Sequence, residues 1–312
     1  MRHKYNIPLI LLILLYTWIS FSLPVNYESL HQLHISLNSL RVIDLALFIP
    51  IFAIWYIAFY GFSSFKIYAE KIENYPDGKG FSIIADGLVV IGLGLILTSF
   101  VSSAVSYFTT QNLGDVPRAV IVSNYVSVLV PLLAFTFIFV GARNLIKISK
   151  IKFSAKNTIP FYLLVIILGV IFAWVAIHNP AKDIEATATR HGLYYLPNYL
   201  IVITIVIPYI ISWFLGIKAA FMLNYYKNKT KGIIYKRSLS YLSRGVILVV
   251  ISEIATQFLN VFNNEINEQL NQHGASFLGP ILLIIYVLLV LIAAGYVLIA
   301  MGAKELNKIE VS

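Results

Sequence analysis

The chain has 312 residues, of which 59% are hydrophobic and only 12% are charged, and it contains no cysteine. This composition is too apolar for a soluble domain and is typical of membrane proteins. The absence of cysteine excludes thiol catalysis, disulfide exchange and cysteine-ligated metal centres. The formal net charge is +9, but the basic residues recur between apolar segments and do not gather in one domain, so we predict no nucleic-acid partner.

A transmembrane helix needs about 20 consecutive, mostly apolar residues. Eight segments meet this requirement, and in chain order they are Ile7–Leu23, Val42–Tyr60, Phe81–Tyr107, Val122–Val140, Ile159–Ile177, Leu196–Leu215, Leu239–Phe262 and Phe277–Met301. The first segment follows a basic start and therefore also fits a cleaved signal peptide, but its internal counterpart, described below, predicts that it is retained. The sequence thus predicts an all-α integral membrane protein with eight transmembrane helices.

The loops between these segments alternate in charge. Of the 23 basic residues, all but Arg41, Arg118, Lys182 and Arg190 fall on the side of the membrane that also holds both termini. Cytoplasmic loops retain an excess of Lys and Arg. The sequence therefore predicts a multi-pass protein of the cell membrane with its N- and C-termini in the cytoplasm.

The two halves of the chain resemble each other at a nearly constant offset. Ile49, Pro50 and Trp55 recur 158 residues later as Ile207, Pro208 and Trp213. The start of the first segment recurs in the fifth at an offset of 152, and the end of the fourth recurs after the eighth at an offset of 161. An even number of spans per unit gives both units the same orientation, as in some transporters. We predict two parallel four-helix repeats, residues 1–150 and 151–312.

Polar residues interrupt two of the apolar segments at equivalent repeat positions. Glu253 lies about fourteen residues into the seventh segment, without a basic residue within one helical turn. Outward from it, one helical face carries Thr256, Gln257, Asn260 and Asn264, and the third segment carries Thr98, Ser99, Ser102 and Ser106. Ionisable groups within a bilayer are costly and usually face the interior of the helix bundle.

Two interpretations of these polar stripes remain open. Small and polar residues commonly hold packed transmembrane helices together. They also line hydrated cavities, and a cavity open to the outside and ending at Glu253 would explain the acid together with the neighbouring amides. This second interpretation favours a site for a small solute or ion between the third and seventh segments.

Asp86 and Arg244 occupy equivalent places near the cytoplasmic ends of the third and seventh segments. If these helices met across the repeat axis, the two side chains would form an ion pair between the repeats. The alternative is that each side chain extends separately to the membrane interface. The sequence leaves both arrangements open.

No sequence pattern identifies an enzyme. The chain has no H-E-x-x-H, G-x-S-x-G or Walker motif, and five of its six histidines are scattered through predicted outer loops. We therefore predict no catalytic residue, metal or cofactor. The leading hypothesis is a membrane protein that binds or passes a small solute or ion through the polar cavity. The alternatives are a non-transporting subunit, scaffold or sensor and, with less support, an intramembrane enzyme acting on lipid with Glu253 as acid or base.

Overall fold

The computed structural model describes residues 37–110, 116–149, 159–178, 202–230, 232–261 and 275–309, together with Leu11 and Leu14, and this part of the chain consists of helices joined or ended by short turns. Its elements are α3 (Leu37–Lys71), α4 (Gly78–Thr110), α5 (Val116–Ile148), α6 (Ile159–His178), the π-helical turn η2 (Val202–Val206), α9 (Ile207–Lys229), α10 (Ile233–Val261) and α12 (Ala275–Leu306).

Seven of the eight predicted segments overlap these helices, the sixth only from Val202 onward, and the first, Ile7–Leu23, lies outside the described residues apart from two positions. Five described segments are long and apolar enough to cross a membrane, namely Ile49–Lys71, Val126–Ile148, Val202–Lys229, Ile233–Leu259 and Gly279–Leu306. The protein therefore has the helical, apolar character of a membrane protein. Several helices extend beyond their predicted ends because an apolar run marks only the hydrocarbon crossing, whereas helical hydrogen bonding continues into the interface.

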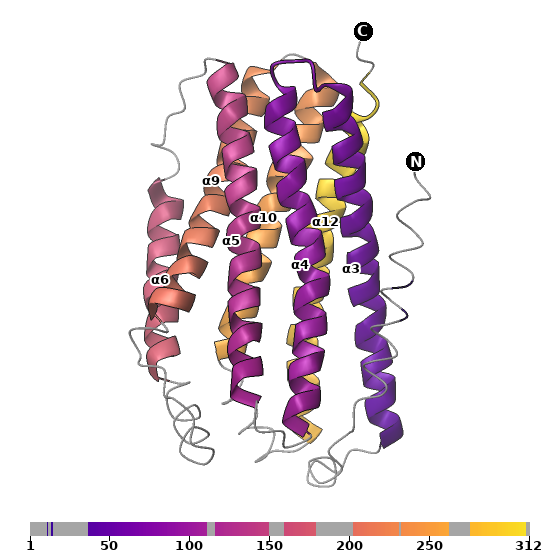
Figure 1. The fold of residues 1–312 in the computed structure, drawn as a ribbon, viewed down its shortest axis with the longest axis vertical. Helices are drawn as coiled ribbons and strands as arrows, with labels where there is room; N and C mark the ends of the chain where they lie inside the picture. Colours follow the sequence, from indigo (N-terminus) through magenta and orange to yellow (C-terminus); the bar gives the residue numbers. More distant parts are fainter. Residues whose placement is uncertain are drawn as a thin grey trace.

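Six helices form a closed ring. Each packs against two neighbours in the order α3, α4, α5, α9, α10, α12 and back to α3. In Figure 1, α3, α4 and α5 form the near layer, α9, α10 and α12 lie behind them, and α6 lies at the side against α9. In this order, α4 and α10 lie on opposite sides of the ring.

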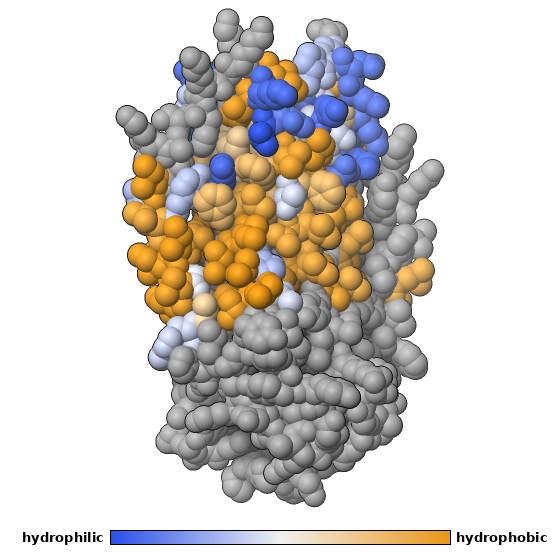
Figure 2. All heavy atoms as spheres, turned by 60° about the vertical axis from the view of Figure 1, so that its left-hand side comes forward, coloured by the Kyte–Doolittle hydropathy of each residue, from blue (hydrophilic) through white to orange (hydrophobic). Residues whose placement is uncertain are grey.

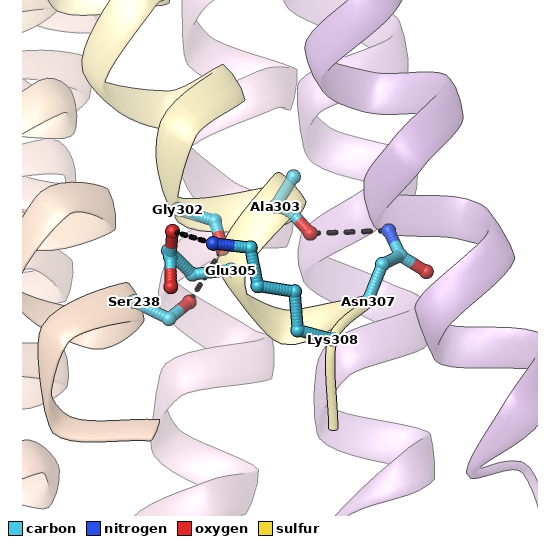
Figure 3. Close-up of polar contacts among 6 residues, drawn as sticks. All are labelled: Ser238, Gly302, Ala303, Glu305, Asn307 and Lys308. Atoms are coloured by element: carbon cyan, nitrogen blue, oxygen red, sulfur yellow. Dashed lines mark hydrogen bonds and ion pairs between the residues drawn. The ribbon is translucent and has the colours of Figure 1, made fainter. Parts of the chain in front are cut away.

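The C-terminal end of α12 and the turn after it close this ring through hydrogen bonds to the helices on both sides, and Figure 3 shows the bond on the α10 side. On one side, Ser238 of α10 donates from Oγ to the carbonyl oxygen of Gly302 at 2.6 Å. On the other side, Asn307 donates from Nδ2 to the carbonyl oxygen of Ser64 in α3 at 2.7 Å. These two bonds link the end of α12 directly to α10 and to α3.

Glycines bring neighbouring helices of the ring into close contact. A Cβ atom at Gly87 would lie 2.8 Å from the carbonyl oxygen of Ala134, so α4 and α5 are in backbone contact there. A Cβ atom at Gly245 would lie 2.7 Å from the carbonyl oxygen of Gly295, which joins α10 to α12 in the same way. Small residues permit this approach, which is typical of helix packing in membranes.

The bundle has one polar, basic end. Apart from Lys218, which stands at the midpoint of α9, every Lys and Arg whose side chain the structure describes lies toward the end where α3 passes into α4 and α9 into α10. Figure 2 shows hydrophilic residues gathered at this end and a broad hydrophobic surface below them. Large apolar side chains are exposed along that surface, for example Val170 at 64% and Ile167 at 56% on α6. Such a surface suits lipid, not water.

Candidate functional site

Glu253 lies on α10 in a partly buried position between α9 and α12. Its carboxylate oxygen Oε1 accepts a hydrogen bond of 2.9 Å from Nε2 of Gln257, one turn further along the helix. Gln257 is itself buried, with 7% of its surface exposed. No described Lys or Arg forms an ion pair with Glu253, so the acid has no cationic partner in the part of the chain that the structure describes.

Two buried tyrosines complete the surroundings of Glu253. Tyr209 comes from α9 and Tyr296 from α12, and the charge of Glu253 acts electrostatically on both hydroxyl groups. Tyr209 is linked in turn to α5, since its hydroxyl and Oγ of Ser127 are 3.0 Å apart. Three helices of the ring therefore contribute polar groups near a single carboxyl group, and a fourth, α5, is linked to them through Ser127. We call Glu253, Gln257, Tyr209 and Tyr296 the Glu253 site.

The backbone is irregular immediately before Tyr209. Pro208 has no N–H to donate to the carbonyl four residues earlier, so a regular α-helix cannot continue through it undisturbed. The chain passes from the π-helical turn Val202–Val206 into α9 at this point. Local π-helical geometry re-aims side chains and is frequent at functional sites, and here it precedes one of the two tyrosines.

The predicted polar stripe is only partly described. Thr256 donates its hydroxyl to the carbonyl oxygen of Ser252 at 2.8 Å, and Ser252 likewise bonds to Leu248 at 2.7 Å, so both hydroxyls are satisfied within α10. Gln257 and Glu253 are brought together, as given above. The side chains of Asn260, Thr98, Ser99, Ser102 and Ser106, and the whole of Asn264, lie outside the described part of the structure.

Asp86 has a different partner from the one hypothesised. Its Oδ1 atom lies 3.5 Å from Nζ of Lys66 in α3, and both side chains are about half exposed, at 47% and 50%. Arg244 is exposed on α10. The physical reason is the order of the ring, in which α4 packs against α3 and α5 while α10 packs against α9 and α12. Asp86 therefore pairs with a residue of the adjacent helix α3.

A second buried polar group lies at the basic end, where four helices meet. Tyr226 of α9 donates a hydrogen bond of 2.8 Å to Oδ2 of Asp77, in the turn before α4. Tyr68 of α3 contacts Phe81, Phe81 contacts Tyr235 of α10, and Tyr235 contacts Tyr226, each edge to face. These side chains, which we call the tyrosine cluster, fill the space between opposite helices of the ring at this end.

Sequence reasoning identified Glu253 and Gln257 but missed Tyr209, Tyr296 and Ser127. Tyrosines in apolar segments are usually read as core or interface residues, because the ring is large and apolar. The available signal was the depth of both tyrosines within predicted spans, where a hydroxyl needs a polar partner.

Among the described residues, no three His, Cys, Asp or Glu side chains lie close enough to hold a metal ion. No family model, curated protein or solved structure matches this chain.

Proposed function

We propose that this chain is a multi-pass protein of the cell membrane that binds or passes a small cation or cationic solute at the Glu253 site. The observation that carries the proposal is the carboxyl group of Glu253 within the helix bundle, with Gln257, Tyr209 and Tyr296 around it and no described basic partner. An acid inside a membrane bundle usually marks a substrate or ion pathway. Carboxylate, amide and hydroxyl oxygens are suitable ligands for a small cation.

The distribution of charge supports a cytoplasmic position for the basic end. The described Lys and Arg side chains gather there, and the positive-inside rule assigns such an end to the cytoplasm. The tyrosine cluster fills the bundle at the same end. The proposed route to Glu253 therefore runs from the outer end, along the faces that carry Asn260 and Asn264 in the sequence.

Close contacts at glycines support a duplication of residues 1–150 as residues 151–312. Gly87 and Gly245 are 158 residues apart, and their partners Ala134 and Gly295 are 161 residues apart. These are the offsets that relate the two halves of the sequence, and each glycine approaches the carbonyl oxygen of its own partner. The same backbone contact thus occurs once in each half.

A second pair of contacts repeats this relation nearer the basic end. A Cβ atom at Gly141 would lie 2.6 Å from the carbonyl oxygen of Gly80, and one at Gly302 would lie 3.0 Å from that of Ser238. The offsets are again 161 and 158 residues. The ring has the same symmetry, because α3–α4–α5 corresponds to α9–α10–α12. Chance resemblance between apolar helices does not predict matched contacts.

The duplication helps to separate a functional role from a packing role. At these offsets, the first-half counterparts of Tyr209, Glu253 and Tyr296 are Ile51, Leu95 and Phe135. The counterpart of Gln257 is Ser99, so the first half keeps a small polar residue there but lacks the acid and both tyrosine hydroxyls. Since the first half is built without the acid and the two tyrosines, their presence in the second half supports a binding role.

One observation favours the alternative of a non-transporting subunit or scaffold. The hydroxyls of Thr256 and Ser252 donate their protons within their own helix, as in a packed helix that lines no cavity. Under this alternative, Glu253 would be a packing residue whose carboxyl group is satisfied by Gln257. The transport or binding function requires an ion to reach the carboxyl group of Glu253, whereas the subunit or scaffold function does not.

Charge movement in proteoliposomes tests the proposed function. We would reconstitute the full chain and record capacitive currents on a solid-supported membrane after rapid jumps in Na⁺, K⁺ or H⁺ concentration. We expect the wild type to give a current with at least one of these cations and Glu253→Gln to lose it. Asp86→Asn is the matched control, because Asp86 is half exposed and pairs with Lys66, and it should keep the current. Absence of current in the wild type, or equal currents in Glu253→Gln, would overturn the proposal.

A further inference from the structure

A groove runs between α3 and α12 on the outside of the ring. Its volume is about 210 Å³, and its lining is formed by Tyr56, Ile57, Tyr60, Val297, Ala300, Met301 and Lys304. All but the last are apolar or aromatic, and Lys304 stands at the basic end of the groove. An apolar groove that ends at a lysine complements an anionic phospholipid. The acyl chain would contact the apolar lining, and the phosphate would contact the lysine.

The groove faces the surroundings and not the bundle interior. Tyr56, Met301 and Val297 are 53%, 40% and 38% exposed, and they lie within two of the segments that are long and apolar enough to cross a membrane. In a bilayer, these side chains meet lipid. A depression in this surface is therefore filled by lipid chains unless another part of the protein covers it.

The opposite groove, between α5 and α9, is filled by the protein itself. There Nζ of Lys218 lies 5.3 Å from the ring centre of Phe139 and 5.4 Å from that of Phe214, in cation–π contact. Under the duplication proposed above, Phe139 corresponds to Ala300 and Lys218 to Tyr60. The phenylalanine ring between α5 and α9 therefore has the smaller methyl group of Ala300 as its counterpart, and Ala300 lines the groove.

Lys304 is available to an anionic headgroup. The neighbouring Lys308 is engaged with Glu305, their Nζ and Oε1 atoms being 2.6 Å apart. Lys304 is exposed and forms no ion pair with any residue that the structure describes. A lysine at the cytoplasmic interface attracts anionic lipid, by about 1 kcal/mol per basic residue. The net charge of the chain, +9, also favours the binding of anionic lipid.

We propose that the groove between α3 and α12 binds one anionic phospholipid of the leaflet at the basic end. Its phosphate group contacts Lys304, and one acyl chain lies between Ile57 and Val297. The apolar lining of the groove and the charge of Lys304 support lipid binding directly. Only the comparison with Lys218 rests on the proposed duplication. Lipid binding in this groove does not depend on the Glu253 site, which lies elsewhere in the ring.

Native mass spectrometry of the detergent-purified full chain tests the proposal, with phosphatidylglycerol and phosphatidylcholine as added lipids. We expect wild type to retain one phosphatidylglycerol in preference to phosphatidylcholine. Lys304→Gln should lower the occupancy about fivefold, the ratio that about 1 kcal/mol gives. Arg143→Gln, at the corresponding end of the filled groove, is the matched control and should change nothing.

A second variant fills the groove without touching the charge. Val297→Trp should abolish lipid retention, whereas Val290→Trp, at a 64% exposed position of the same helix, should not. A photo-reactive residue at position 297 should cross-link to lipid. Equal retention of both lipids, insensitivity to Val297→Trp, or cross-linking to residues 1–36 of the same chain would overturn the proposal. Cation currents measured on the same variants distinguish its failure from failure of the Glu253 site.

Discussion

Tyr226 and Asp77 are 149 residues apart in the chain and share a hydrogen bond of 2.8 Å. The bond joins the end of α9 to the turn between α3 and α4, and therefore ties the second half of the chain to the first at the basic end. This hydrogen bond lies near the edge-to-face contact of Phe81 in α4 with Tyr235 in α10. The ring is therefore stabilised by contacts between opposite helices as well as between adjacent ones.

This bond predicts a coupled loss of stability. Tyr226→Phe keeps the ring and removes the hydroxyl, and it should cost about 1.5 kcal/mol, as expected for a hydrogen bond to a charged group. Asp77→Asn in the same background should cost less than it does alone, because its partner is already gone. Thermal unfolding of the purified single and double variants measures the coupling. Strictly additive effects would show that the bond contributes nothing.

Replacement of Glu253 by the leucine of the first half should leave the fold intact. Leu95 is the counterpart of Glu253, and leucine avoids the cost of placing an acid within the membrane, about 2.5–3.5 kcal/mol at a helix centre on insertion scales. We expect Glu253→Leu to unfold at the same temperature as wild type or higher, and to lose cation-induced currents. A clear fall in unfolding temperature would instead identify Glu253 as a packing residue.

The glycine contact between α10 and α12 predicts a sharp sensitivity to added volume. A Cβ atom at Gly245 would lie 2.7 Å from both the carbonyl oxygen of Gly295 and Cγ1 of Ile299. Gly245→Val should therefore force the helices apart and cost about 1–3 kcal/mol. Gly279→Ala is the control, since no atom lies within 4 Å of the added methyl group. Thermal unfolding that ranks the two variants equally would contradict the contact.

The orientation is tested by reporter fusions at loop positions. Fusions after Lys79, Lys152 and Lys231 should report the cytoplasm, because these loops belong to the basic side. Fusions after Asn112, His191 and Gln272 should report the outside. Two consecutive loops on one side would contradict both the count of eight spans and the cytoplasmic position of the termini.

The sequence was sufficient to predict where the helices lie along the chain, but not which helices pack against each other. Apolar length identifies a span because a bilayer requires about 20 apolar residues, and each described helix overlaps such a run. Helix order in the ring depends on small differences in side-chain fit, and lipid-facing and helix-facing surfaces are equally apolar. For this reason Lys66 was not recognised as the partner of Asp86. Tyr209 and Tyr296 were missed because a tyrosine in an apolar segment resembles any other core aromatic residue.

The closed ring has a consequence for how such a protein could arise. Contacts within one half join α3 to α4 and α4 to α5, whereas the ring is completed only by α5 against α9 and α12 against α3. Under the proposed duplication, these two junctions are the same interface used twice. A half-length ancestor would have needed a second copy of itself, related by a two-fold axis, to cover both exposed edges. Fusion of the two genes would have made that pairing independent of protein concentration, and would have freed one copy to acquire an acid that the other never needed.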